Sequence, residues 1–307
     1  MSVVARLLPL AAALLLSPLL LGIIGRIKAR VGGRKGAPLL QPYWDLARLA
    51  AKGEVLSGTA TGVFRLGPVV GLASAVVALL LLPLGPFPAA AAFPGDIVLM
   101  VYLLALGRFG LMAAALDTGS SFEGMGASRE GTFSALAEPA LLLVLCGLAW
   151  SRGEATLAAC LGGFTGGFAA STLPARALLS GALFLVLLAE NCRIPVDDPA
   201  THLELTMIHE VMVLDHSGPT FGIVQYAAGL KLWLFEVLLV SPWLPGMRSP
   251  WASAALLLGA LGLTAVAVGL VESLTARLRL SQVPRFLGLA GVLAALGDLV
   301  LLTAGRP

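Results

Sequence analysis

Long apolar runs recur along the whole chain, and they restrict its fold more than any other feature of the sequence. A helix needs about 20 apolar residues to cross roughly 30 Å of bilayer hydrocarbon. The runs are continuous rather than alternating with a period of two, and only helices or closed barrels satisfy their backbone groups in lipid. We therefore predict an all-α fold, a polytopic bundle of about eight transmembrane helices that forms one integral membrane domain over residues 1–307.

The eight predicted spans follow from hydropathy alone, and the fourth, with its flanks, is the shortest. They are Val3–Ile24, Leu66–Pro86, Gly95–Leu116, Glu138–Trp150, Leu173–Glu190, Phe221–Trp243, Trp251–Leu274 and Phe286–Leu302. The first has no small-residue cleavage site after it, so we interpret it as a retained span rather than a signal peptide. The Gly-rich stretch 161–167 is open to interpretation as a loop, a re-entrant segment or a helix extension.

The composition argues against a soluble enzyme. Of the residues, 58% are hydrophobic and only 12% are charged, whereas a soluble domain carries roughly 25% charged residues. The basic sequence pI of about 9.0 does not indicate a nucleic-acid partner, because the positive charge is concentrated in one early loop. The expected surroundings are the lipid bilayer and other membrane subunits.

The cysteine and histidine patterns predict no metal or cofactor bound by this chain. Cys146, Cys160 and Cys192 are odd in number and lack CxxC spacing, which argues against a disulfide framework, a zinc site or an iron–sulfur cluster. The three histidines are seven residues apart, at 202, 209 and 216. That spacing is about 10 Å along a helix, too far for ligands of one metal ion.

The basic residues indicate the orientation, because cytoplasmic loops carry an excess of Lys and Arg. With the N-terminus outside, the inside loops are 25–65, 117–137, 191–220 and 275–285, and they hold most of the 20 basic residues. The 25–65 loop is the most basic of them. Elaborate polar loops on one face predict that the chain docks other proteins there.

The acidic segment 191–220 is the most unusual inside loop. It carries Asp197, Asp198, Glu204, Glu210 and Asp215, and apolar residues are interleaved with these acids. A solvated loop is the plain alternative, but the interleaving favours a buried amphipathic helix. Glu190, which precedes the segment at the end of an apolar span, is costly unless it is paired or hydrated.

Further ionisable residues lie in or beside the spans: Arg108, Asp117, Glu123, Glu130, Glu138, Lys231, Glu236, Glu272 and Asp298. Each of them could either belong to an ion path or simply form an ion pair that joins two helices. Ionisable groups in membrane helices are rare and mark ion pathways. So many of them in an otherwise apolar chain favour a hydrated polar path.

Several motifs resemble those of the complex I proximal membrane subunit family, in the family's order and over nearly the whole chain. Residues 25–54, GRIKARVGGRKGAPLLQPYWDLARLAAKGE, resemble its first inside loop. Residues 189–205, AENCRIPVDDPATHLEL, resemble its AE-x-x-R-x-P-F-D-L-P-E-x-E-x-EL motif. Residues 128–140 resemble its fourth-helix stretch, and residues 275–287 its R-x-R-x-DQ loop.

The departures from the family pattern favour one branch of it. Two further glutamates of the family are replaced by Ala200 and His202, and its EYSG sequence corresponds to Asp215-His216-Ser217-Gly218. In this region the sequence resembles more closely the membrane-bound group-four nickel-iron hydrogenases, of the formate hydrogenlyase subunit 4 and hydrogenase-4 component C type. The loss of acids weakens the expectation of quinone binding and leaves an ion path in place.

The resemblance implies a non-catalytic anchor and proton (ion)-path subunit in a bacterial or archaeal cell (inner) membrane. Its implied partners are hydrogenase small and large subunits and an iron–sulfur protein on the cytoplasmic face, together with antiporter-like membrane subunits. Iron–sulfur clusters and the nickel-iron centre would belong to those partners. The alternatives are a quinone-chamber subunit of a complex I-type NADH-quinone oxidoreductase and an independent transporter, against which the lack of an internal repeat argues.

Two sets of residues carry this expectation. The predicted ion path contains Glu123, Glu138, Glu190, Asp197, Glu204, Glu210, Asp215, Lys231 and Glu236. The predicted docking and structural set contains Arg26, Arg30, Arg34, Gln41, Asp45, Arg129, Arg193, Arg277 and Arg279.

Overall fold

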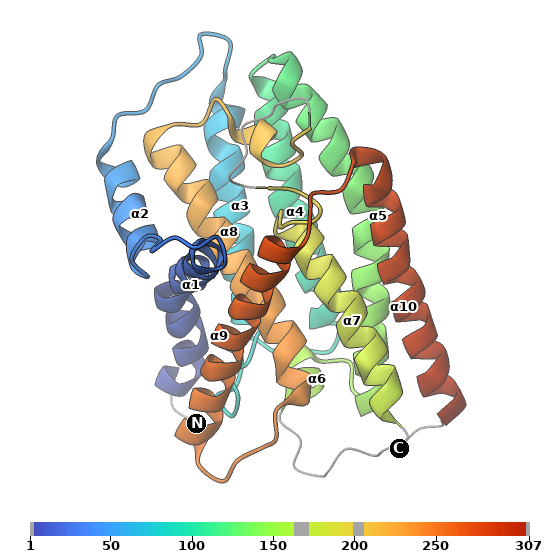
Figure 1. Ribbon diagram of the computed structural model, residues 1–307. Coiled ribbons are helices and arrows are strands. Elements are labelled where there is room, and N and C mark those ends of the chain that lie inside the picture. Colours follow the sequence, from blue (N-terminus) through green and yellow to red (C-terminus); the bar gives the residue numbers. More distant parts are fainter. Residues whose placement is uncertain (1–2, 163–171, 199–205, 305–307) are drawn as a thin grey trace.

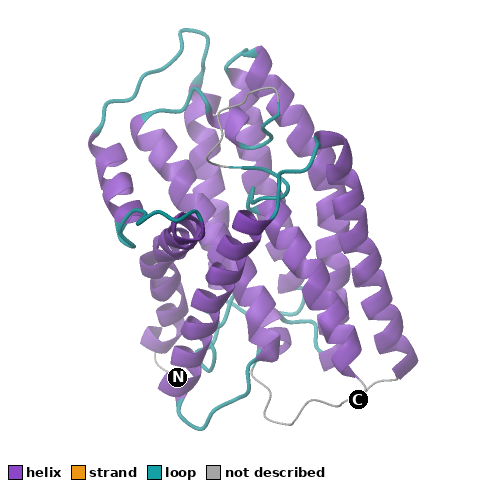
Figure 2. Ribbon diagram, in the orientation of Figure 1, coloured by secondary structure: helices purple, strands orange, loops and turns teal. Residues whose placement is uncertain are grey.

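The computed structural model describes residues 3–162, 172–198 and 206–304. Within these residues the chain is helical, with loops between the helices and no strand (Figure 2). The α-helices are α1 Val3–Val31, α2 Gln41–Ala51, α3 Gly62–Leu80, α4 Asp96–Asp117, α5 Ser121–Arg152, α6 Leu157–Leu161, α7 Leu173–Glu190, α8 Gly218–Val240, α9 Pro250–Leu274 and α10 Val283–Ala304. The short 3₁₀ helices are η2 Glu210–Val213, η3 Ser241–Trp243 and η4 Leu280–Gln282.

Eight of the described helices, α1, α3, α4, α5, α7, α8, α9 and α10, are long and apolar enough to cross a membrane. This confirms the predicted all-α bundle. An even number of crossings brings both chain ends to one face, and the start of α1 and the end of α10 do lie at the same end of the bundle (Figure 1). Which side of the membrane that end faces stays a prediction.

The fourth span differs most from its predicted form. Hydropathy marks only 138–150 as apolar, whereas α5 is 32 residues long and begins at Ser121. Most of the predicted inside loop 117–137 is therefore helical. The charged first half of α5 remains in the helix because its charges have partners. Arg129 Nη1, for example, donates to the Met207 carbonyl at 2.7 Å.

The acidic segment also differs from its prediction. Before α8 begins at Gly218, its described residues form turns and η2, without an α-helix, so the prediction of an amphipathic helix is wrong for this part. The Asp197 carboxylate accepts the backbone N–H groups of Ile208 and His209, both at 3.0 Å. Side-chain acceptors of this kind compete with helical hydrogen bonding. Glu204, His202 and the rest of 199–205 lie outside the described residues.

Glycines and one carboxylate position the helices around α4. At the α3–α4 crossing, a Cβ on Gly110 would lie 3.1 Å from the Gly67 carbonyl oxygen, so the two backbones approach closely there. At the end of α4, Asp117 accepts hydrogen bonds from the Thr61 N–H at 2.7 Å and the Thr61 hydroxyl at 2.8 Å. The start of α3 is thus fixed against the end of α4.

Helix α8 lies at the centre of the bundle. It packs against α1, α2, α3, α7 and α9, and it buries large side chains such as Trp233 and Phe235. The short helix α2 differs from all the spans, because none of its residues is buried, and it lies beside α1 and α8 at the edge of the bundle (Figure 1). Residues of α1, α2, α3 and α8 line a cavity beside α4.

Candidate functional site: a charged chamber

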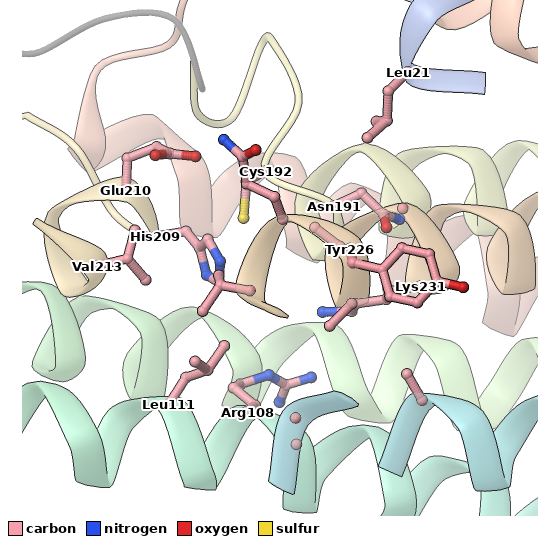
Figure 3. Close-up of a pocket in the computed structure, with 18 of the residues that line it drawn as sticks. Leu21, Arg108, Leu111, Asn191, Cys192, His209, Glu210, Val213, Tyr226 and Lys231 are labelled. Atoms are coloured by element: carbon pink, nitrogen blue, oxygen red, sulfur yellow. The ribbon is translucent and has the colours of Figure 1, made fainter. Parts of the chain in front are cut away.

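A cavity of about 570 Å³, the chamber, lies among α1, α2, α3, α4, α8 and the turn after α7. Apolar side chains such as Leu21, Leu104 and Leu111 form part of its wall. Arg108 from α4 and Lys231 from α8 reach the same space, and Cys192, His209 and Glu210 lie along another part of the lining (Figure 3). The chamber therefore combines an apolar wall with a strongly charged region.

Arg108 is the shared partner of three carboxylates. Its Nη2 atom donates to both oxygens of Glu190, at 2.8 and 2.9 Å. Its Nε atom lies 3.5 Å from a Glu130 oxygen, and its Nη1 atom donates to Glu138. Lys231 Nζ lies 2.8 Å from the second Glu190 oxygen. We call these five residues the Arg108 network.

The positions of these side chains follow from local sequence. Arg108 lies between Gly107 and Gly110 on an otherwise apolar helix, and those glycines bring α4 close to α3. Glu190 ends α7, while Glu130 and Glu138 lie two helical turns apart on one face of α5. The network therefore joins four helices, with two cations facing three carboxylates.

Burial makes the network costly to break. The side chains of Arg108 and Glu190 are 6% and 4% exposed, whereas that of Glu138 is 33% exposed. Removing one partner of a buried ion pair typically costs 3–5 kcal/mol, because the other charge is left uncompensated. Glu138 is the most accessible carboxylate of the network, whereas Glu130 and Glu190 line the chamber.

Three groups along the chamber lining have strongly shifted pKa values. Burial raises the pKa of Glu210 to about 7, and the neighbouring carboxylate of Asp197 acts in the same direction. Burial lowers the pKa of His209 to about 4, helped by the positive charge of Lys231, and burial raises the pKa of the Cys192 thiol. Near neutral pH, Glu210 changes its charge while His209 and Cys192 stay neutral.

Two further charge clusters lie outside the Arg108 network. Asp197 pairs with Arg277 at 2.7 Å, and both of its oxygens also accept backbone N–H groups. Glu272 of α9 lies 2.8 Å from Lys28 Nζ and 3.4 Å from Arg193 Nη1. The first cluster connects the acidic segment to the 275–285 loop, and the second connects α1, α9 and the turn after α7.

The structure brings together only part of the predicted ion-path set. Glu138, Glu190 and Lys231 meet in the Arg108 network, and Glu210 lines the same chamber. Glu123 is buried away from that cavity, where it accepts the Asp215 N–H at 3.0 Å, and the Asp215 side chain is exposed. Glu236 is fully buried in α8. Glu204 lies outside the described residues.

The predicted docking set is divided in a similar way. Arg30, Arg34 and Arg279 are exposed, and Arg26 is half-buried. Gln41 donates to Asp45 within α2 at 2.8 Å, and Asp45 lines the chamber. By contrast, Arg129, Arg193 and Arg277 make internal contacts. These three hold the loops in place rather than presenting free charge.

Arg108 and Glu130 belong to the site, although sequence reasoning singled them out only as ionisable residues in or beside spans. The available signal was an arginine in the middle of an apolar run, which needs carboxylate partners in a membrane. Its three partners come from α5 and α7, so the pairing depends on tertiary structure. Among the described residues, no group of three His, Cys, Asp or Glu side chains could hold a metal ion.

Comparisons with known proteins agree with the motif-level resemblance. A family model described as NADH dehydrogenase matches residues 1–303. The chain is 34% identical to hydrogenase-4 component C of Escherichia coli over 258 residues, which cover 84% of this chain and 80% of that protein. It is 30% identical to formate hydrogenlyase subunit 4 of the same organism over 287 residues, or 90% and 92% of the two chains.

Two further matches have lower sequence identity. A subunit of the NADH-quinone oxidoreductase of Verminephrobacter eiseniae is 29% identical over 269 residues, or 83% of this chain and 74% of that protein. A chain in the structure of the membrane-bound sulfane sulfur reductase, an archaeal respiratory membrane complex, has the same fold, with a TM-score of 0.81 at 22% identity. That match covers 98% of this chain and 99% of the other. With its eight apolar helices, this chain is a multi-pass membrane protein.

Proposed function

Because this chain belongs to the NADH dehydrogenase family, we propose that it is the membrane-anchor and proton-path subunit of a membrane-bound hydrogenase or formate hydrogenlyase-type complex. In this role it couples electron transfer in an attached hydrogenase arm to ion translocation. The observation that carries the proposal is the Arg108 network, in which the buried Arg108–Glu190 pair is joined by Glu130, Glu138 and Lys231 beside the chamber. Buried charges of this number in a membrane bundle are typical of a proton relay.

Differences in burial suggest different roles for the carboxylates. Glu190 is held by both Arg108 and Lys231, which stabilise its charge, while Glu138 is the most exposed acid of the network. Glu210 lies elsewhere on the chamber lining with a pKa of about 7, so it can exchange protons at neutral pH. A change of charge in the docked arm would alter proton occupancy by shifting these local pKa values.

The proposed partners dock on the face that carries the basic 25–65 loop and the acidic segment. They are hydrogenase small and large subunits and an iron–sulfur protein, with antiporter-like subunits beside the bundle in the bilayer. The iron–sulfur clusters and the nickel-iron centre belong to these partners. The exposed guanidinium groups of Arg30 and Arg34 offer positive charge to such an arm.

Glu138→Gln in the complete complex tests the proposal. The amide keeps the size of the side chain and its ability to accept from Arg108, so assembly is expected to remain intact. Proton movement coupled to electron transfer is expected to fall several-fold in proteoliposomes. The matched control is Glu154→Gln, which changes an exposed carboxylate outside the helices. Normal coupling in Glu138→Gln would remove this residue from the path.

The volume and apolar wall of the chamber favour a second candidate, the quinone-chamber subunit of an NADH-quinone oxidoreductase. A cavity of about 570 Å³ is within the range of small-molecule sites, and an apolar wall suits a hydrophobic ring and tail. Solvent extraction of the purified complete complex distinguishes the candidates. Stoichiometric quinone, lost when Leu104 and Leu111 are enlarged to Phe, would support the second candidate, and its absence supports the first.

A further inference from the structure

Pro18 leaves one carbonyl of α1 without its helical donor. It lies inside α1 and lines the chamber. Proline has no backbone N–H, so the Leu14 carbonyl, four residues earlier, receives no hydrogen bond from its own helix. A carbonyl without a partner is costly in the bilayer, where no water replaces the lost bond. This part of α1 therefore needs a donor from another element.

Two tyrosine hydroxyls bind α1 at this point. Tyr226 of α8 donates to the Leu14 carbonyl at 2.8 Å, and Tyr43 of α2 donates to the next carbonyl, that of Leu15. The chain has three tyrosines, so two of them serve adjacent carbonyls in the same turn of α1. We call these two hydrogen bonds, which connect α1 to α8 and α2, the tyrosine latch.

Helix α2 is a wall between the chamber and the outside of the bundle. Pro42, Asp45 and Leu46 line the chamber, whereas Trp44 is 49% exposed. None of the residues of α2 is buried, so apolar packing holds this helix less firmly than it holds the spans. Hydrogen bonds to its neighbours therefore matter more for α2 than for the spans.

The start of α2 lies at the depth of the bilayer. A Cβ on Gly22 would lie 2.1 Å from the Leu39 carbonyl oxygen, so the chain just before α2 rests directly on α1. Gly22 and Leu15 both belong to the apolar span Ala5–Val31. The exposed Trp44 is of the residue type that is enriched at membrane interfaces. Lipophilic molecules of the bilayer thus meet this wall on its outer side.

We propose that the tyrosine latch keeps α1 and α2 closed over the chamber and thereby excludes lipids and other lipophilic molecules of the bilayer from the charged region inside. This inference rests on the proposed proton-path function, because the Arg108 network exchanges protons with a chamber that holds water rather than acyl chains. Tyr226→Phe leaves the Leu14 carbonyl without a partner, and Tyr43→Phe releases α2 from α1. Either change opens the wall.

Alkylation of the native cysteines in the complete complex, in membranes, tests the inference. A lipophilic probe, pyrenyl maleimide, is dissolved in the bilayer, and peptide mass spectrometry gives its rate at each cysteine. Cys146 is exposed and Cys160 is buried, so they set the upper and lower limits, while Cys192 reports from the chamber lining. In the wild type Cys192 is expected to react about as slowly as Cys160. In Tyr226→Phe and Tyr43→Phe it is expected to react several-fold faster.

Tyr102→Phe is the matched control, because Tyr102 is 69% exposed on α4, outside the latch, and its loss is expected to leave the rate at Cys192 unchanged. A charged maleimide, which does not dissolve in the bilayer, separates loss of the seal from general loosening, and its rate at Cys192 is expected to be equal in all variants. If Tyr226→Phe fails to assemble, the double variant Pro18→Ala, Tyr226→Phe is measured instead. It returns an N–H donor to the Leu14 carbonyl and lacks only the connection to α8.

Rapid labelling of Cys192 by pyrenyl maleimide in the wild type would overturn the inference. Wild-type rates in both latch variants, or an equal rise with the charged reagent, would also overturn it. The proposed function fails differently, through unimpaired coupled proton movement in Glu138→Gln.

Discussion

At the scale of single residues, Lys231 is the member of the Arg108 network that reaches Glu190 from α8. Its side chain is 22% exposed, compared with 6% for Arg108, so it is the more accessible of the two cations. Lys231→Gln leaves Glu190 with the bidentate Arg108 contact and is expected to preserve assembly. Arg108→Met removes the shared partner of three acids and is expected to prevent stable assembly, at a cost of about 3–5 kcal/mol.

The yield of complex for these two variants, measured by co-purification from membranes, checks this prediction. Arg108→Lys serves as the intermediate case, because it keeps the charge but cannot form the bidentate contact. Equal yields for Arg108→Met and Lys231→Gln would show that the network does not stabilise the bundle.

Glu210 gives the site a dependence on pH. Its pKa is about 7 in the folded chain, above the usual value of roughly 4.3. A raised pKa means that the contribution to stability is present below about pH 4 and is lost as the pH rises through 7. The melting temperature of the wild-type complex is therefore expected to fall more between pH 5.5 and 8 than that of Glu210→Gln.

Between these pH values the melting temperature of the wild type is expected to fall a few degrees more than that of Glu210→Gln, since 1 kcal/mol corresponds to about 2–4 °C in proteins of this size. Thermal unfolding followed by tryptophan fluorescence across this pH range measures it. Parallel curves for wild type and Glu210→Gln would contradict the assignment of neutral-range titration to Glu210.

At the scale of elements, the packing of η2 against α5 depends on one glycine. A Cβ on Gly126 would lie 2.9 Å from a Met212 side-chain atom and 3.1 Å from the Ile208 carbonyl oxygen. Gly126→Ala is expected to displace η2 and destabilise the complex by about 1–3 kcal/mol. Gly124→Ala, on the same helix, meets only a distant Leu116 methyl and is expected to be neutral or slightly stabilising.

The comparison of these two alanine variants by thermal unfolding is direct, because the helix propensity gained is the same in both. Equal melting temperatures would show that η2 does not pack closely against Gly126. A loss confined to Gly126→Ala would support the close contact between α5 and the described end of the acidic segment.

Hydropathy predicted the number of spans because membrane helices are defined by apolar length, but it placed the start of α5 too late. The charges of Glu123, Arg129 and Glu130 made residues 117–137 look like a loop. In the structure each of these side chains has a partner on another element, which lets the helix continue. The same dependence on tertiary contacts explains η2 and its turns, where Asp197 captures backbone N–H groups.

The candidate site was predictable in its parts and not in its connections. Glu138, Glu190 and Lys231 are visible in sequence as charges in or beside apolar runs. Their common partner Arg108 comes from another helix, and the order in which helices pack is not encoded in hydropathy. Asp197, predicted on the ion path, has both oxygens bound by Arg277 and backbone groups, a pairing that no linear pattern shows.

At the scale of the whole molecule, the polar loops gather at the end of the bundle opposite the start of α1 and the end of α10 (Figure 1). Arg30 and Arg34 are exposed near the end of α1. Reversing both to Glu is expected to release the soluble arm from membranes, because it replaces attraction with repulsion across the interface. Fractionation of membranes and cytosol, followed by detection of the arm, measures this.

The matched control reverses Arg248, which is exposed in the loop between η3 and α9, at the other end of the bundle. Its reversal is expected to leave the arm on the membrane. Quantitative co-purification of the arm with the Arg30 and Arg34 double variant would mean that the first loop is not its main contact.

The central claim is that the Arg108 network carries protons when the attached arm transfers electrons. Complete complex reconstituted in proteoliposomes, with a pH indicator inside and electron transfer followed in the same sample, tests it most directly. We predict an uncoupler-sensitive change of internal pH in the wild type. In Glu138→Gln, electron transfer is expected to persist while proton movement per electron falls several-fold. A Glu138→Gln complex that moves as many protons per electron as the wild type would contradict the account.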